Sequence, residues 1–175
     1  MKSINTFDLT SHSYGIGYDS LGREFYFDIE DFNKIKEYYW RVRSSRYVTT
    51  SIWKPLQKRI EEISLHRFLL DFPDGLEIDH INLCRYDNRK ENLRVVTTSQ
   101  NQMNVGIRKN NNSGVSGVNW DSATNKWRAR ICINNRRISL GVYDDINDAI
   151  EARKQAEKEY FGEYRHKISQ NGNIE

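Results

Sequence analysis

An acid and a histidine stand side by side at Asp79 and His80, and two asparagines follow at Asn92 and Asn101, twelve and twenty-one residues after the histidine. Hydrolysis of a phosphodiester needs a base that takes a proton from water and a cation that absorbs the charge on the phosphate and the leaving oxygen. A neutral histidine, with an ordinary pKa near about 6.5, can act as that base at neutral pH. The four residues therefore have the layout of a small metal-dependent nuclease site.

The segments around these residues predict the elements that would position them. Residues 76–82 and 92–96 fit two strands, separated by a loop rich in Asp, Asn and Arg. Thr98 or Ser99 can then cap a short helix that ends by residue 104. This order would distribute the site over three elements: Asp79 and His80 on the first strand, Asn92 on the second, and Asn101 in the first helical turn, where the positive end of the helix favours a phosphate.

Residues 63–104 resemble the HNH endonucleases with a ββα-metal site, in the phage and homing-endonuclease subgroup whose last motif residue is asparagine. The similarity is carried by D-H-I-N from Asp79, D-N-R-K-E-N-L-R from Asp87 and S-Q-N from Ser99. The resemblance implies a role for each residue of the site: Asp79 and Asn101 as ligands of one divalent cation, His80 as the general base, and Asn92 as the residue that orients its imidazole. Oxygen ligands suit Mg²⁺ or Mn²⁺ better than zinc.

Several polar residues near this motif have less specific expectations. Arg89 and Arg94 are candidates for contacts to the phosphates that flank the cut, although Arg94 could instead pair with a carboxylate. Asp87 and Asn88 are expected to fix the loop by local hydrogen bonds. His66 is expected to be structural or to contact DNA rather than to bind the metal.

A second module follows a polar stretch that contains three consecutive asparagines. Residues 117–120, 126–134 and 137–142 predict three antiparallel strands, and residues 145–161 predict an amphipathic helix with Asp145 as its N-cap. On the middle strand, apolar residues alternate with Lys126, Arg128 and Arg130, so one face should pack on the helix and the other should be exposed. Trp120 and Trp127 are expected in the core.

Residues 112–164 resemble the AP2 domain, on N-S-G-V-S-G-V-N-W from Asn112, K-W-R-A-R-I from Lys126 and L-G-V-Y from Leu140. The resemblance implies that the exposed sheet face binds duplex DNA, with its contacts among Asn119, Lys126, Arg128, Arg130 and Arg137. Charge agrees with this: residues 101–142 sum to 7 − 1 = +6, residues 1–100 to 15 − 15 = 0, and residues 143–175 to 5 − 8 = −3.

The whole chain predicts the α+β class: a ββα-metal nuclease module and a three-stranded antiparallel sheet with one packed helix. Residues 1–68 alternate short strands, at 13–18, 24–28, 47–53 and 60–66, with one helix within 31–41, and the role of residues 1–62 is open. The predicted organisation is an N-terminal segment at 1–62, the nuclease core at 63–104, a linker at 105–111, the AP2-like domain at 112–164 and a tail at 165–175.

Composition narrows the class of protein. Cys84 and Cys132 belong to no C-x-x-C pair, which argues against a zinc ribbon or a disulfide framework, and no stretch approaches the roughly 20 apolar residues of a membrane span. We therefore expect a monomeric endonuclease that binds double-stranded DNA in the cytoplasm of a bacterial or phage-infected host cell. A non-catalytic DNA-binding regulator and an RNA-directed or structure-directed nuclease are the alternatives.

Overall fold

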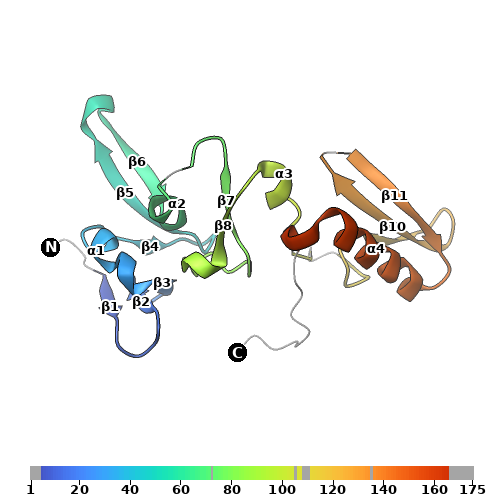
Figure 1. The fold of residues 1–175 in the computed structure, drawn as a ribbon, viewed down its shortest axis with the longest axis horizontal. Helices are drawn as coiled ribbons and strands as arrows, with labels where there is room; N and C mark the ends of the chain where they lie inside the picture. Colours follow the sequence, from blue (N-terminus) through green and yellow to red (C-terminus); the bar gives the residue numbers. More distant parts are fainter. Residues whose placement is uncertain (1–4, 72, 105, 108–110, 135, 166–175) are drawn as a thin grey trace. The chain divides into compact units, whose positions relative to one another are not determined.

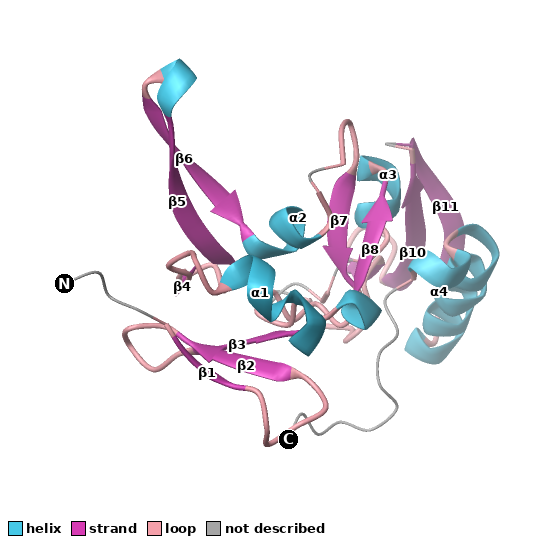
Figure 2. Cartoon of the chain, turned by 60° about the vertical axis from the view of Figure 1, so that its left-hand side comes forward, coloured by secondary structure: helices cyan, strands magenta, loops and turns pink. Residues whose placement is uncertain are grey.

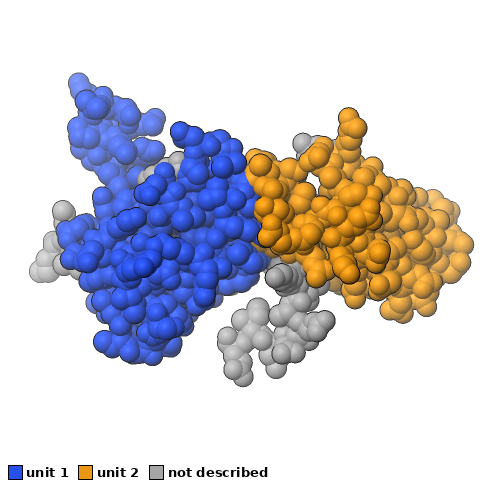
Figure 3. All heavy atoms as spheres, viewed as in Figure 1, with its two compact units in different colours: residues 1–96 blue, residues 97–175 orange. Residues whose placement is uncertain are grey.

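The computed structural model describes residues 5–71, 73–104, 106–107, 111–134 and 136–165. The chain divides into two compact units, residues 1–96 and residues 97–175 (Figure 3). Both are built from small antiparallel sheets and a few helices (Figures 1 and 2), which is compatible with the predicted α+β class.

The first unit begins with a three-stranded sheet of β1 (Thr6–Asp8), β2 (Gly15–Tyr18) and β3 (Glu24–Phe27), in that order. Gly17 lies opposite Phe25, and a Cβ built on Gly17 would come within 2.2 Å of the Phe25 ring. Glycine is therefore required there, because the fully buried ring lies directly over the neighbouring backbone.

A single turn of 3-10 helix, η1 (Ile29–Asp31), and one turn of α-helix, α1 (Phe32–Ile35), follow β3. The helix predicted within residues 31–41 is thus much shorter than expected. It ends early because Trp40 is fully buried and its indole Nε1 donates to the Ile35 carbonyl at 3.0 Å. This contact turns the chain toward the next sheet.

The second sheet contains β4 (Arg41–Val42), β5 (Val48–Lys54) and β6 (Arg59–Ser64), with the turn η2 (Pro55–Gln57) between the two long strands. The predicted strand at 60–66 ends at Ser64, and His66 belongs to the short helix α2 (Leu65–Leu69). One hydrophobic core joins these elements to the first sheet: Phe25, Phe27, Ile35, Trp40, Val42, Val48, Leu65 and Leu69. Residues 1–62 therefore share their core with the segment that follows them.

The third sheet is the antiparallel pair β7 (Glu77–His80) and β8 (Leu93–Val96), joined by a loop that ends in η3 (Lys90–Asn92). Both strands were predicted. The pairing sets Asp79 opposite Arg94 and His80 opposite Leu93.

The second unit starts with the short helix α3 (Thr98–Asn101), capped by Thr97 rather than by Thr98 or Ser99. Its sheet has β9 (Val118–Asp121), β10 (Lys126–Ile133) and β11 (Arg136–Tyr143), with β10 in the middle, and α4 (Ile146–Tyr160) and η4 (Gly162–Tyr164) follow. As predicted, Asp145 caps α4, accepting a hydrogen bond from the Asn147 amide at 2.7 Å.

The alternation predicted for the middle strand is confirmed. Ala129 and Ile131 are buried and pack in clusters with Ala149 and Ala156 of α4. The prediction that Trp120 is a core residue was wrong, since it is 50% exposed and meets Trp127 edge-on. No helix among the described residues is long and apolar enough to cross a membrane.

Candidate nuclease site

The β7–β8 pair fixes the acid of the predicted site. Asp79 is 5% exposed, and its Oδ2 accepts hydrogen bonds from Arg94 Nε at 2.9 Å and Nη2 at 2.7 Å. The pair follows from the strand register, because directly opposed residues of an antiparallel pair lie on the same face. Of the two roles considered for Arg94, the structure shows the ion pair with a carboxylate; a phosphate contact by Arg94 stays a prediction.

His80 follows Asp79 on β7 and is 4% exposed. Burial lowers its pKa, while the nearby Asn88 side chain and the charges of Asp79 and Asp87 act in the opposite direction. The net effect is a pKa below the usual value, so His80 is neutral at neutral pH. A neutral imidazole is the form that can accept a proton from water.

His66 of α2 lies next to His80, a contact that the sequence did not predict. It is 7% exposed, its ring lies edge-to-face against His80 with centroids 5.0 Å apart, and its Nδ1 is buried with no hydrogen-bond partner in the described part of the chain. Burial, followed by the charges of His80 and Arg67, lowers its pKa to about 3. Two neutral histidines therefore lie together. The sequence predicted a structural or DNA-contacting role for His66, but its spacing did not indicate the contact with His80.

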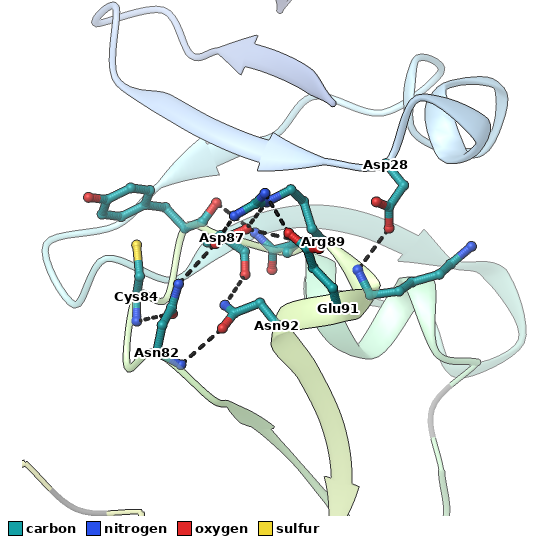
Figure 4. A network of polar contacts seen from close by, with 10 residues as sticks. Asp28, Asn82, Cys84, Asp87, Arg89, Glu91 and Asn92 are labelled. Carbon is teal, nitrogen blue, oxygen red and sulfur yellow. Dashed lines mark hydrogen bonds and ion pairs between the residues drawn. The ribbon is translucent and has the colours of Figure 1, made fainter. Parts of the chain in front are cut away.

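The loop between β7 and β8 is held by Asp87 and Asn92 (Figure 4). The Asn92 amide nitrogen donates to the Asp87 carbonyl at 2.8 Å, and its Oδ1 accepts from the Asn82 backbone amide at 2.9 Å. Asp87 accepts from Asn82 Nδ2 at 3.0 Å and takes a two-point contact from Arg89, each bond 2.8 Å long. In these contacts Asn92 fixes the loop, and the role predicted for Asn92 at His80 stays a prediction.

The same loop is tied to the N-terminal sheet. Tyr26 of β3 donates from its amide to the Tyr86 carbonyl at 2.8 Å, and its own carbonyl accepts from Asn88 at 2.9 Å. Asp28 accepts from the Lys90 amide at 2.8 Å, and the Lys90 ammonium pairs with Glu30 and Asp31. The loop thus acquires its shape from residues about sixty positions earlier in the chain.

Arg89 is engaged within this network. Besides Asp87 it pairs with Glu91 at 2.6 Å, and its guanidinium lies over the Tyr14 ring at 4.6 Å. The hydrogen bond and charge of Asp87 raise the pKa of Arg89. Its predicted contact with a DNA phosphate remains a prediction.

In the second unit, the residues predicted to bind DNA share one face of the sheet. Strand pairing sets Asn119 opposite Arg128, and Cys132 opposite Arg137. Asn119, Arg128, Arg130 and Arg137 are exposed, while Lys126 is partly exposed and pairs with Asp144 at 3.0 Å. Arg128 pairs with Asp121, whereas Arg130 and Arg137 have no ion-pair partner within the described ranges. α4 covers the opposite face.

The donor chemistry of the predicted metal ligands suits a hard cation. Asp79 offers a carboxylate, and Asn101, at the end of α3, offers an amide oxygen. The described residues contain no group of three or more His, Cys, Asp or Glu side chains that could hold a metal. One carboxylate and one amide oxygen are the kind of ligands that a hard cation such as Mg²⁺ takes, so metal binding by this pair stays a prediction.

Comparison with known proteins agrees with the geometry of this region. Residues 71–103 match the HNH endonuclease family. The match spans β7, the loop, β8 and α3. The match ends before β9–β11, so these comparisons do not support an AP2-like domain, which stays a prediction from the sequence resemblance.

Two viral relatives are similar to parts of the chain. Protein 3.8 of Escherichia phage T7 is 29% identical over 65 residues, which is 37% of this chain and 54% of that protein. A protein of Acanthamoeba polyphaga mimivirus named Uncharacterized HNH endonuclease L560 is 24% identical over 136 residues, which is 74% of this chain and 66% of that protein. The chain thus covers about half to two thirds of these relatives. No solved structure gives a significant match.

Proposed function

We propose that this chain is a divalent-metal-dependent endonuclease that hydrolyses phosphodiester bonds of double-stranded DNA at a partly specific site, as homing endonucleases do. The observation that supports it most is the position of Asp79 and His80 next to each other on β7, in a strand pair that lies within the HNH match. His80 takes the proton from the attacking water. Asp79 and Asn101 are the proposed ligands of one Mg²⁺ or Mn²⁺ ion, which when bound would stabilise charge on the phosphate and the leaving oxygen.

The remaining residues of the site hold these groups in place. Arg94 fixes the Asp79 carboxylate. Asp87 and Asn92 keep the loop in one conformation, so the base need not reorganise when substrate binds. The part of the site that the first unit contributes, with Asp79 and His80, would therefore be largely preformed.

The basic face of β9–β11 is the proposed DNA anchor. Its five residues, Asn119, Lys126, Arg128, Arg130 and Arg137, lie on the side that α4 leaves open. A β element can enter the major groove, and arginine can read guanine or grip phosphate there. We propose an AP2-like mode of binding by a monomer in the cytoplasm of a bacterial or phage-infected cell.

Cleavage of supercoiled plasmid, with and without Mg²⁺, tests this proposal. We expect the wild-type chain to nick or linearise the plasmid only with the metal, and His80→Ala to reduce the rate by about 10²-fold or more, since general bases contribute 10²- to 10⁴-fold. Duplex affinity should stay within a few-fold. His12→Ala, which changes an exposed histidine outside the site, is the control. Unchanged nicking by His80→Ala would refute the base. Binding without any cleavage by the wild-type chain would support a DNA-binding regulator instead.

A further inference from the structure

The β5–β6 hairpin extends away from the rest of the first unit, as both ribbon views show (Figures 1 and 2). Its outer half carries unusually exposed apolar side chains: Trp53 is 56% exposed, Ile60 69% and Leu56, in the turn, 99%. Exposed apolar residues on a strand pair invite association with other chains, so folded proteins usually avoid them. Their presence together at one tip calls for a partner.

The two faces of this tip differ in character. Trp53 is paired with Ile60, so both lie on one face, and the next pair outward, Lys54 with Arg59, lies on the other. Residues 53–60 carry three cations, Lys54, Lys58 and Arg59, and no acid. Lys54 has a weak ion pair with Glu61 at 4.0 Å, and both side chains are partly exposed. The tip therefore combines an apolar edge with a local charge of +3.

The apolar face leads back toward the candidate nuclease site. Along the hairpin, the Trp53–Ile60 pair is followed on the same face by Ser51–Glu62 and Thr49–Ser64. Thr49, Glu62, Ser64 and His66 line one pocket of about 440 Å³, and the His66 ring touches His80. A ligand that lies along this face would thus reach from the hairpin tip to the residues beside the proposed base.

We propose that the β5–β6 hairpin is a second DNA-binding element, which inserts its apolar tip into the groove of the duplex next to the cleavage site. Leu56 is the wedge between two base pairs, Trp53 and Ile60 support it, and Lys54, Lys58 and Arg59 bind the flanking phosphates. Apolar wedges of this kind unstack a base step, and cations beside them hold the backbone. The inference rests on the proposed function only for the identity of the ligand as DNA, and it assigns the hairpin a role separate from hydrolysis.

The charge on the tip is what favours DNA over other occupants. In a tip-to-tip pair of two copies, residues 53–60 of one chain would offer no acid to the three cations of the other. A polyanion satisfies the basic face while the groove takes up the apolar one. Duplex DNA offers both properties within one ligand.

Base unstacking can be measured directly with a duplex selected for the tightest binding to the wild-type chain. The base analogue 2-aminopurine, placed at successive positions, becomes brighter where a step opens. We expect brightening at one step with the wild-type chain and none with Leu56→Ser, whose affinity should fall by at least about five-fold. Leu21→Ser removes another exposed leucine, 73% exposed, from a different turn and should bind and brighten normally.

The salt dependence of binding tests the cations. Lys58→Gln should lower the slope of log affinity against log salt by about 0.9, the value for one phosphate contact on B-DNA. Lys34→Gln, which removes an exposed lysine from α1, should leave the slope unchanged. Leu56→Ser should keep the wild-type slope, because it removes no charge.

The outcomes separate this inference from the proposed function. Brightening that depends on Leu56 in a chain that never cleaves DNA would support the hairpin and refute the nuclease. Cleavage by a chain whose Leu56→Ser and Lys58→Gln variants bind, brighten and respond to salt like the wild type would refute the hairpin alone. A dimer that Leu56→Ser converts to a monomer in sedimentation, with unchanged DNA affinity, would make the tip a self-interface and would also overturn the inference.

Discussion

Two arginine-rich regions of this chain were predicted from the sequence to contact DNA, and their arginines differ in burial and in ion pairing. Around the β7–β8 loop, Arg89 and Arg94 are mostly buried and bind Asp87 and Asp79. On the β9–β11 sheet, Arg130 and Arg137 are exposed and have no ion-pair partner in the described part of the chain. Arginines close to the proposed chemistry thus support the protein, while those farther along the sequence are available to a ligand. The sequence motifs alone do not show which arginines stabilise the protein and which are available to a ligand. Burial and strand register do.

The largest loss of stability is expected when the buried ion pair of Asp79 and Arg94 is broken. Arg94→Ala would leave the Asp79 carboxylate buried without its guanidinium, and removal of one partner of a buried ion pair typically costs about 3–5 kcal/mol. Urea unfolding should therefore show a large loss of stability. A variant that unfolds at the wild-type midpoint would contradict the supporting role of Arg94.

The burial of His66 predicts how the stability of the first unit depends on pH. Burial lowers the pKa of His66 to about 3, whereas an unfolded histidine titrates near 6.5. Between these values the unfolded chain binds the proton and the folded chain does not, so stability should fall as pH drops below about 6.5, by up to about 1.4 kcal/mol per pH unit. His66→Phe should flatten this fall, and His12→Asn should not. The free energy of unfolding, measured at pH values from about 4 to about 7, would show this difference between the two variants. An equal slope in His66→Phe would exclude His66 as the source.

The smallest effect on stability is expected on the exposed sheet. Arg130→Ala should change the free energy of unfolding by less than about 0.5 kcal/mol, as surface substitutions usually do. Its salt slope for duplex binding should nevertheless fall by about 0.9 if Arg130 contacts one phosphate. Arg137→Ala is the parallel variant. If Arg130→Ala and Arg137→Ala both bound duplex DNA like the wild type, this face would not belong to the DNA interface, and the proposed difference between the two regions would be wrong.

The sequence predicted what depends on local pattern. Alternation placed Ala129 and Ile131 inside the second unit, and Asp145 was identified as a helix cap, because both signals lie within a few residues. The strands that carry His80 and Arg94 were also predicted. The helix within residues 31–41 was also predicted, but its early end at Ile35 was not, since that end is set by the burial of Trp40, a tertiary effect that outweighs helical spacing.

Long-range pairing explains most of what the sequence could not show. The bond between Asp79 and Arg94 needs the register of two strands, and the contact of His66 with His80 needs the packing of α2. The attachment of the loop to Tyr26 and Asp28 joins segments about sixty residues apart. No periodic signal in the chain reports such contacts.

The backbone bonds between Tyr26 and the loop also bear on the order of folding. Chains emerge from the ribosome N-terminus first, so β3 is made well before Tyr86 and Asn88. The later segment can then fold on a template that is already in place. A fragment cut to the motif alone, such as residues 63–104, would lose that template, and transplanting the motif into another scaffold would require a substitute for the edge of β3.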